Sequence, residues 1–329
     1  MKRRIELWAR HEYHYPLAYS FMPNVVAYLH DDPTPRPCML VAPGGAYCFL
    51  SPTEGEIIAQ RFFDLGYNAF VLSYTTDLTM SCPLKRQPLR DISRAIRLIR
   101  SKAAAYHVIP DQLAICGFSA GGHLCASICV HHMEIADPDP GLQQYSNRPD
   151  AAILSYPVIS SGSCTHADSM RALLGEAPDA AALAFAANER NVSSQTPPCF
   201  LWHTMDDSCV PVENSLLFAD ACKQAGVPYA LHLFSKGPHG LSTADSVWVE
   251  EGWKADYTLE QAYGVAEQIR QGSLTGFTPN EALDMVLLHG KHVARDYFLK
   301  GSVSNREVAV WPLLAHGWLQ QQFQKDVNL

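Results

Sequence analysis

The chain of 329 residues predicts an α/β fold in which a mainly parallel central sheet is covered by helices on both faces. Two observations lead to this fold class. Short apolar, strand-like segments alternate with segments of helical periodicity along the centre of the chain, and parallel strands need such crossover connections. In addition, 47% of the residues are hydrophobic, which is enough for a large core. We expect residues 1–329 to form a single domain.

The elements of the predicted sheet follow in chain order. Short apolar runs predict strands at residues 37–41, 67–74, 113–116, 151–156, 199–203 and 229–234. Apolar residues three or four positions apart predict helices at 55–65, 89–103, 213–225 and 312–323, besides one that begins after residue 119. Gly226 stands where a C-cap glycine belongs. Arg90, Arg94 and Arg97 lie opposite the apolar stripe of their helix and are expected to form a solvated face.

Two segments interrupt the alternation. Residues 158–197 are rich in Ala and Ser and are expected to cap the functional site. Residues 241–305 predict a helical insertion that is too short to form a core of its own. Its apolar faces, at 262–269 and 283–287, must pack on the core, on a second subunit or over a cleft. We expect it to form a cleft wall or a dimer contact.

Residues 113–122 carry the most specific motif of the chain. Four apolar residues lead into Gly117-Phe118-Ser119-Ala120-Gly121, and helical periodicity follows. This pattern predicts a nucleophile elbow, in which a strand turns sharply into a helix and the serine has a strained backbone. The two glycines allow strand and helix to approach closely. The hydroxyl of Ser119 is then held at the carboxyl edge of the sheet, beside the helix N-terminus.

A serine nucleophile needs a base and a carboxylate that orients the base. Both occur downstream of Ser119, each after a predicted strand: Asp206 and Asp207 follow residues 199–203, and His239 follows residues 229–234. One of the two aspartates is expected to be a turn former. Because parallel strands end at the same edge of the sheet, these side chains are expected to lie near Ser119.

A glycine-containing loop, Pro43-Gly44-Gly45-Ala46, follows the strand predicted at 37–41. Enzymes with a nucleophile elbow place an oxyanion-binding loop at this point of the fold. Glycines let backbone N–H groups converge on one spot without obstruction by side chains. We therefore predict an oxyanion hole formed by the amides of Gly45 or Ala46 together with that of Ala120.

Composition argues against several other classes of protein. The net charge is −8 and no basic stripe is present, so nucleic acid is not an expected partner. No apolar run approaches the roughly 20 residues that span a bilayer, so a membrane is not expected either. The basic N-terminus lacks the apolar stretch of a secretory signal, which predicts a cytoplasmic protein with its ten cysteines reduced. No metal-ligand spacing is found, and no cofactor is implied.

Together these motifs resemble the bacterial acetyl-xylan or feruloyl esterase-like family of the α/β-hydrolase superfamily, related to the hormone-sensitive-lipase group. The resemblance runs from about residue 22 to residue 234, includes His239, and resumes in the terminal helix. Four segments carry it, at residues 42–47, 88–96, 117–123 and 200–211. It implies an α/β-hydrolase fold with a helical insertion after the catalytic histidine.

The resemblance also implies roles for individual residues. It assigns Ser119 as nucleophile, Asp206 as acid, His239 as base, and Tyr47 to substrate binding. The expected activity is a serine carboxylesterase that acts through an acyl-enzyme on short acyl groups, such as acetyl groups on sugars. An amide hydrolase of the prolyl-oligopeptidase type and an inactive hydrolase fold used as a binding module are the alternatives. A small ester is the expected partner, and a homo-oligomer is left open.

Overall fold

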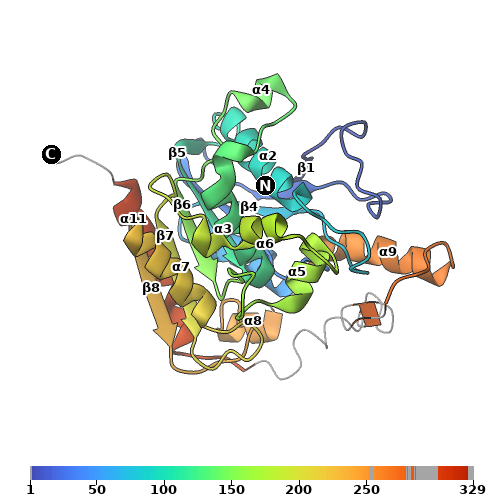
Figure 1. Ribbon diagram of the computed structural model, residues 1–329. Helices are drawn as coiled ribbons and strands as arrows, with labels where there is room; N and C mark the ends of the chain where they lie inside the picture. The colour runs from blue at the N-terminus through green and yellow to red at the C-terminus, as the bar shows by residue number, and fades with distance from the viewer. Residues whose placement is uncertain are drawn as a thin grey trace.

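The computed structural model describes residues 2–251, 255–278, 280, 283, 284, 286 and 303–324. Helices cover both faces of one eight-stranded sheet (Figure 1). The strand order is β1-β2-β4-β3-β5-β6-β7-β8. Strands β3 to β8 run parallel to one another, whereas β1 pairs antiparallel with β2, and β2 pairs antiparallel with β4. The predicted α/β fold with a mainly parallel sheet is confirmed.

The strands are β1 (Lys2–Glu6), β2 (Asn24–Tyr28), β3 (Arg36–Ala42), β4 (Asn68–Ser73), β5 (Val108–Phe118), β6 (Ala151–Ser155), β7 (Cys199–Thr204) and β8 (Tyr229–Phe234). The six predicted strands are all present. The sequence analysis missed β1 and β2. Both contain only five residues, and β1 is mostly charged because it forms an exposed edge of the sheet.

The helices are α1 (Glu56–Asp64), α2 (Gln87–Ser101), α3 (Ser119–His131), α4 (Pro140–Gln143), α5 (Ala167–Leu174), α6 (Ala180–Ala186), α7 (Glu213–Gln224), α8 (Ser246–Glu251), α9 (Glu260–Arg270) and α11 (Trp311–Phe323). Short 3-10 helices are η1 (Pro52–Glu54), η2 (His132–Glu134), η3 (Asn188–Arg190), η4 (Tyr257–Leu259) and η5 (Val308–Val310). The predicted helices are present within two residues of their expected ends, and Gly226 follows α7 with a φ of 70°.

The hydrophobic core consists of two clusters, one on each face of the sheet. Successive residues of β3 show the alternation: Leu40 belongs to the cluster beneath α2, α3 and α7, whereas Met39 and Val41 belong to the cluster beneath α1 and α11. Side chains of a strand point alternately to opposite faces, so the central strands of a sheet covered on both sides bury side chains on each face. This packing fixes the strand ends that carry the site.

The expectation that the arginines of α2 form a solvated face is wrong for two of the three. Arg94 is 3% exposed, pairs with Glu12 at 3.1 Å and with Asp137 at 3.3 Å, and lies over the ring of Trp8. Arg97 is also buried and donates to backbone carbonyls of residues 135–145. The N-terminal segment and the chain around α4 cover this face of the helix, which helical periodicity alone does not reveal.

The described part of the insertion packs on the chain itself. Ala262, Val265 and Ala266 of α9 form a small cluster with Leu17 and Leu78. The residues Leu283 and Val286 belong to the same cluster. This face is therefore not free to bind a second subunit. Residues 285 and 287 of the apolar face predicted at 283–287 lie outside the described residues, and the role of the insertion as a cleft wall stays a prediction.

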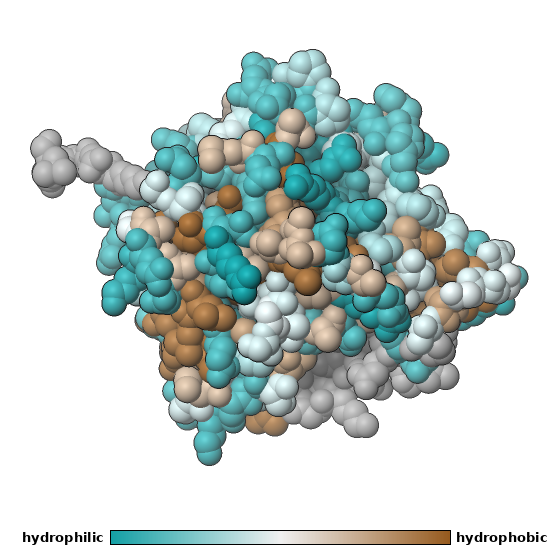
Figure 2. Space-filling model, viewed as in Figure 1, coloured by the Kyte–Doolittle hydropathy of each residue, from teal (hydrophilic) through white to brown (hydrophobic). Residues whose placement is uncertain are grey.

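An apolar region of the surface is visible at the lower left of Figure 2, where Figure 1 places α7 and β8. The exposed large apolar side chains of these elements are those of Leu216, Leu217, Tyr229 and Leu233. All ten cysteines are free, and seven of them are buried. Among the helices described, none combines the length and the apolar character that crossing a membrane requires.

Candidate active site

Ser119 stands at the sharp turn between β5 and α3, as predicted. Its φ of 50° is left-handed, a strained conformation for a residue with a side chain. The neighbouring glycines are required by close approaches. A Cβ atom on Gly117 would lie 2.2 Å from the carbonyl oxygen of Gly121, and one on Gly121 would lie 2.2 Å from that of Ala42. The elbow therefore holds the Ser119 hydroxyl at the carboxyl edge of the sheet.

A continuous chain of hydrogen bonds joins Ser119, His239 and Asp207. The Nε2 atom of His239 lies 2.8 Å from Ser119 Oγ, and its Nδ1 atom lies 2.7 Å from Asp207 Oδ2. A carboxylate only accepts, so Nδ1 carries the proton, and Nε2 accepts from the hydroxyl of Ser119. This tautomer makes His239 able to take the proton of Ser119.

The prediction that Asp206 is the carboxylate beside His239 is wrong. Strand β7 continues to Thr204, one residue beyond its predicted end, and a turn follows in which the amide of Asp207 donates to the carbonyl of Thr204. This turn directs the second aspartate inward. Asp206 is exposed, and its Oδ1 accepts from the amide of Gly237 at 2.7 Å. Asp206 thus holds the loop of His239 without touching the imidazole.

Asp207 is fully enclosed by hydrogen-bond donors. Its Oδ1 accepts from the amides of Cys209 and Val210, each at 2.9 Å. Its Oδ2 faces His239 and, at 3.4 Å, the Nε2 atom of the buried His203. Burial alone would raise the pKa of Asp207, but the hydrogen bonds from the two histidines outweigh it and hold this pKa well below its usual range. Asp207 is therefore ionised.

The loop after β3 runs directly against Ser119. A Cβ atom on Gly44 would lie 2.9 Å from Cβ of Ser119, so only glycine fits there. Gly45 and Ala46 follow with positive φ angles of 119° and 55°. The amide of Ala120, the first after the serine, is in the first turn of α3. The three residues predicted to form the oxyanion hole thus come from the two segments that meet at Ser119.

The carbonyls of this loop are turned toward the loop itself. That of Gly44 accepts from the amide of Ser51 at 2.9 Å, and that of Gly45 accepts from the amide of Cys48 at 2.9 Å. In a trans peptide the N–H points opposite to the C=O. The amides of Gly45 and Ala46 therefore point away from these partners, as donors to an oxyanion must.

A buried carboxylate that the sequence analysis did not identify supports the loop. Glu54 of η1 accepts from the amide of Gly44 at 2.8 Å and from the hydroxyl of Tyr156 at 2.7 Å. The oxygen of Tyr156 accepts in turn from the amide of Ser242, and its ring lies edge-on to that of His239, with centroids 4.9 Å apart. Burial raises the pKa of the Glu54 carboxyl, against the effect of its hydrogen bonds and of the His239 charge.

Comparison with known proteins assigns the family. Residues 28–222, more than half of the chain, match the BD-FAE family model. The chain belongs to the BD-FAE family. The match includes Ser119 and Asp207 but ends before His239, which the structure brings to them from the loop after β8.

Relatives of this BD-FAE chain include two curated proteins. The chain is 50% identical over 259 residues to endo-1,4-β-xylanase B of Butyrivibrio fibrisolvens. The aligned residues make up 78% of this chain and 41% of that protein. The chain is also 31% identical over 227 residues to an acetylxylan esterase of Xylanibacter ruminicola, covering 66% of this chain and 43% of that protein. The chain thus spans less than half the length of these relatives.

Among solved structures, the chain is similar to an acetyl ester-xyloside bifunctional hydrolase from Caldicellulosiruptor lactoaceticus. The TM-score is 0.68 at 39% identity, over 83% of this chain and 97% of that one. This likeness confirms the predicted α/β-hydrolase fold.

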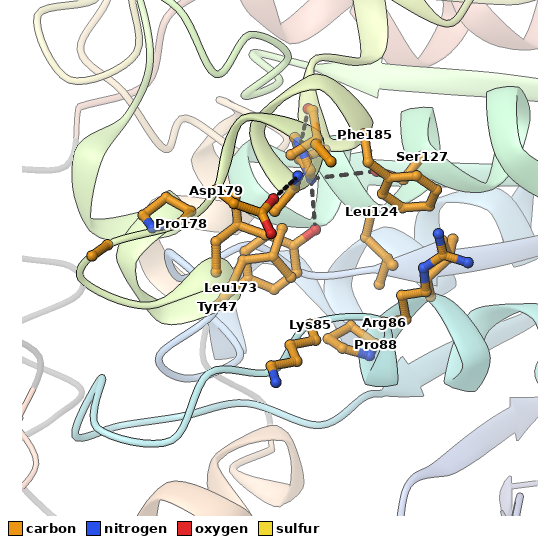
Figure 3. Close-up of a pocket in the computed structure, with 17 residues that line it drawn as sticks. Tyr47, Lys85, Arg86, Pro88, Leu124, Ser127, Leu173, Pro178, Asp179 and Phe185 are labelled. Atoms are coloured by element: carbon orange, nitrogen blue, oxygen red, sulfur yellow. Dashed lines mark hydrogen bonds between the residues drawn. The ribbon is translucent and has the colours of Figure 1, made fainter.

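A cavity of about 620 Å³ adjoins the loop after β3 in this BD-FAE chain (Figure 3). It lies between the start of α2, helix α3 and residues 173–186. The ring of Tyr47 lines it, but neither Ser119 nor His239 does. Residues 173–186 of the cap-like segment predicted at 158–197 therefore line this cavity beside helix α3, and a substrate contact by Tyr47 stays a prediction.

Polar groups in the wall of this cavity bind one another. The hydroxyl of Tyr47 donates to Nδ1 of His123 at 2.8 Å, and Nε2 of His123 donates to the carbonyl of Ala186 at 2.9 Å. Asn188 donates to the carbonyl of His123 and accepts from Ser127. Burial lowers the pKa of His123 to about 4, so the ring is neutral. These bonds join the loop after β3, helix α3 and the cap-like segment.

The cap-like segment also reaches the His239 side of the site. The Nδ1 atom of His166 accepts from the amide of Ser169, at the start of α5. Its Nε2 atom lies 3.5 Å from Sγ of Cys209, two residues after Asp207. His166 is also close enough for the charge of His239 to lower its pKa, in addition to the larger effect of burial.

Sequence reasoning missed Asp207, Glu54, Tyr156, His203 and His123. Only Asp207 had a usable signal, because it was one of two adjacent aspartates at a strand end. The others contribute through burial and orientation, which no local motif encodes. Within the residues that the structure describes, no group of three or more His, Cys, Asp or Glu side chains is placed to hold a metal ion.

Proposed function

We propose that this chain is a serine carboxylesterase that hydrolyses short acyl esters, in particular acetyl esters on xylose-based oligosaccharides. The observation that carries the proposal is the hydrogen-bonded series Ser119–His239–Asp207, with its contacts of 2.8 and 2.7 Å at the elbow. These are the distances at which a base takes a proton from a nucleophile. The names of the relatives, an acetylxylan esterase and an acetyl ester-xyloside hydrolase, support the substrate class.

The chemistry proceeds in two halves. As Ser119 Oγ attacks the ester carbonyl carbon, its proton passes to Nε2 of His239, and the carbonyl oxygen becomes an oxyanion. The amides of Gly45, Ala46 and Ala120 are the proposed donors to this oxyanion. When the bond between carbonyl carbon and alkoxy oxygen breaks, His239 returns the proton to the leaving alcohol.

The acyl-enzyme is then hydrolysed by the same groups. His239 takes a proton from water, whose oxygen attacks the acyl carbon. Collapse of the second tetrahedral intermediate releases the carboxylic acid and returns a proton to Ser119. Asp207 stays ionised throughout and stabilises the imidazolium that forms twice in each cycle.

The substrate range is tested with purified protein and 4-nitrophenyl acetate, butyrate and octanoate, together with acetylated xylo-oligosaccharides assayed by acetate release. The proposal expects the highest kcat/KM for acetate among the nitrophenyl esters, and release of acetate from the oligosaccharide. Ser119→Ala provides the baseline. Faster turnover of octanoate than of acetate would contradict the short-acyl preference, and a higher kcat/KM for a matched anilide would indicate an amide hydrolase.

A further inference from the structure

We propose that Glu54 is a positioning residue for ester hydrolysis: its buried carboxylate holds the loop after β3 at Gly44 and, through Tyr156, supports the imidazole of His239. This inference rests on the proposed function. It adds a second carboxylate, remote from Asp207 in sequence and bound to different groups, to the residues on which the rate depends.

Hydrogen bonding indicates that Glu54 acts as an anion. Its Oε2 accepts a hydrogen bond from the amide of Gly44, and a backbone N–H can only donate. Its Oε1 lies 2.7 Å from the hydroxyl of Tyr156, whose oxygen already receives the amide proton of Ser242. The hydroxyl proton of Tyr156 therefore points at Glu54. Each carboxylate oxygen thus accepts a hydrogen bond, as an ionised group does.

The contact with Gly44 determines the direction of the neighbouring amides. Glu54 and Ser51 are three residues apart at η1, and they bind the N–H and the C=O of Gly44 respectively. Because both polar groups of Gly44 are used, the peptide that carries the amide of Gly45 has one orientation. A shift of this loop would move the proposed oxyanion donors, and misplacement by about 1 Å costs on the order of 100-fold in rate.

Glu54 also acts on His239, through its contact with Tyr156. The ring of Tyr156 meets the imidazole edge-on, and the carboxylate of Glu54 lies at the hydroxyl end of that ring. The charge of His239 in turn favours the ionised form of Glu54. By reciprocity, Glu54 stabilises the imidazolium that forms during catalysis.

Other charged or titratable groups also act on His239. They are Asp207 after β7, His166 before α5, Tyr156 after β6 and Ser119 itself. Glu54 differs from Asp207 and Ser119 in making no direct hydrogen bond to the imidazole. Its effect on the pH profile is therefore expected to be smaller than that of Asp207.

The test compares Glu54→Gln, Glu54→Asp and Tyr156→Phe with the matched control Glu56→Gln, a buried glutamate two residues along whose carboxyl lies beside Tyr28. Folding is checked by thermal unfolding, and kcat, KM and the pH profile of kcat/KM are measured with 4-nitrophenyl acetate. Glu54→Gln keeps the shape but removes the charge. Glu54→Asp keeps the charge but shortens the reach to both partners.

We expect Glu54→Gln to lower kcat by about 10- to 100-fold with little change in KM. The acidic limb of its pH profile should move to lower pH by about half a pH unit or more, because a negative charge near the imidazolium is lost. Glu54→Asp should lower kcat while leaving that limb in place. Glu56→Gln should behave as the wild-type protein.

A folded Glu54→Gln protein with wild-type kcat and an unmoved acidic limb would overturn the inference, as would a lower kcat with no shift of the limb. If Glu54→Gln does not fold, Tyr156→Phe decides: a reduced kcat supports the inference, and a wild-type kcat assigns Glu54 to folding alone. Failure of the proposed function would be seen separately, as wild-type protein that hydrolyses the ester no faster than Ser119→Ala.

Discussion

The strands on the two sides of β5 supply different kinds of group to Ser119. On the side of β6, β7 and β8, the loops after β7 and β8 contribute an ionised carboxylate and an imidazole in direct contact. On the side of β3, the following loop carries the amides proposed to bind the oxyanion, and the buried Glu54 and neighbouring amides hold this loop. The first region depends on the identity of side chains, and the second depends on the shape of the backbone. Substitutions that change charge should therefore act mainly on one region, and substitutions that change shape mainly on the other.

The largest difference is expected between the two adjacent aspartates. Asp207→Asn should lower kcat by roughly 10³- to 10⁴-fold, because an amide can donate to Nδ1 and so favour the wrong tautomer of His239. Asp206→Asn should cost less than about 10-fold, because its oxygen can still accept from Gly237. Steady-state kinetics with 4-nitrophenyl acetate give both values. The opposite ranking would return the role to Asp206.

On the side of β3, Gly44→Ala is the matched change of shape. Its Cβ would lie 2.7 Å from the carbonyl oxygen of Phe118 and 2.9 Å from Ser119 Cβ, so the loop must shift. We expect kcat to fall by about 100-fold. Gly317→Ala, which meets no atom within 4 Å, is the control. A folded Gly44→Ala protein with wild-type kcat would show that the position of this loop does not limit the rate.

An effect of a different kind is expected on stability at acid pH. The pKa of His123 is lowered from 6.5 to about 4, so the unfolded chain binds a proton that the folded chain excludes. Stability is then lost as the pH falls from 6.5 toward 4, by up to about 3 kcal/mol. His123→Gln should flatten this part of the plot of unfolding free energy against pH.

The exposed His14 offers a control for that experiment, since His14→Gln should leave the slope unchanged. Denaturant unfolding at several pH values measures both variants. An equal slope in wild-type and His123→Gln protein would mean that another group causes the acid sensitivity.

The two regions also differ in how far the sequence predicts them. Ser119 and His239 could be located at the site because the nucleophile and the base proposed for it must be particular residue types at strand ends. Asp207 could be located only to within one residue, because the choice depended on where β7 ends and how the next turn runs. The strands of the parallel sheet were predicted for a similar reason: burial on both faces requires continuous apolar runs.

Groups that act through orientation escaped prediction. Glu54 follows the glycine loop by several residues, and nothing in its local sequence indicates that both its oxygens are used inside the protein. For Arg94 and Arg97 the sequence predicted a role in a solvated helix face, which is wrong. Segments distant in the chain cover this face of the helix. In both cases contacts between residues far apart in sequence decide the outcome, and local periodicity contains no information about them.

Covalent labelling tests most directly whether Ser119 is an activated nucleophile. Wild-type protein and Ser119→Ala are each treated with a fluorophosphonate, and intact mass followed by peptide mapping locates the adduct. The account predicts one adduct per wild-type chain, on Ser119, and none on the folded Ser119→Ala protein. An unlabelled wild-type protein, or equal labelling of the Ser119→Ala protein, would contradict it.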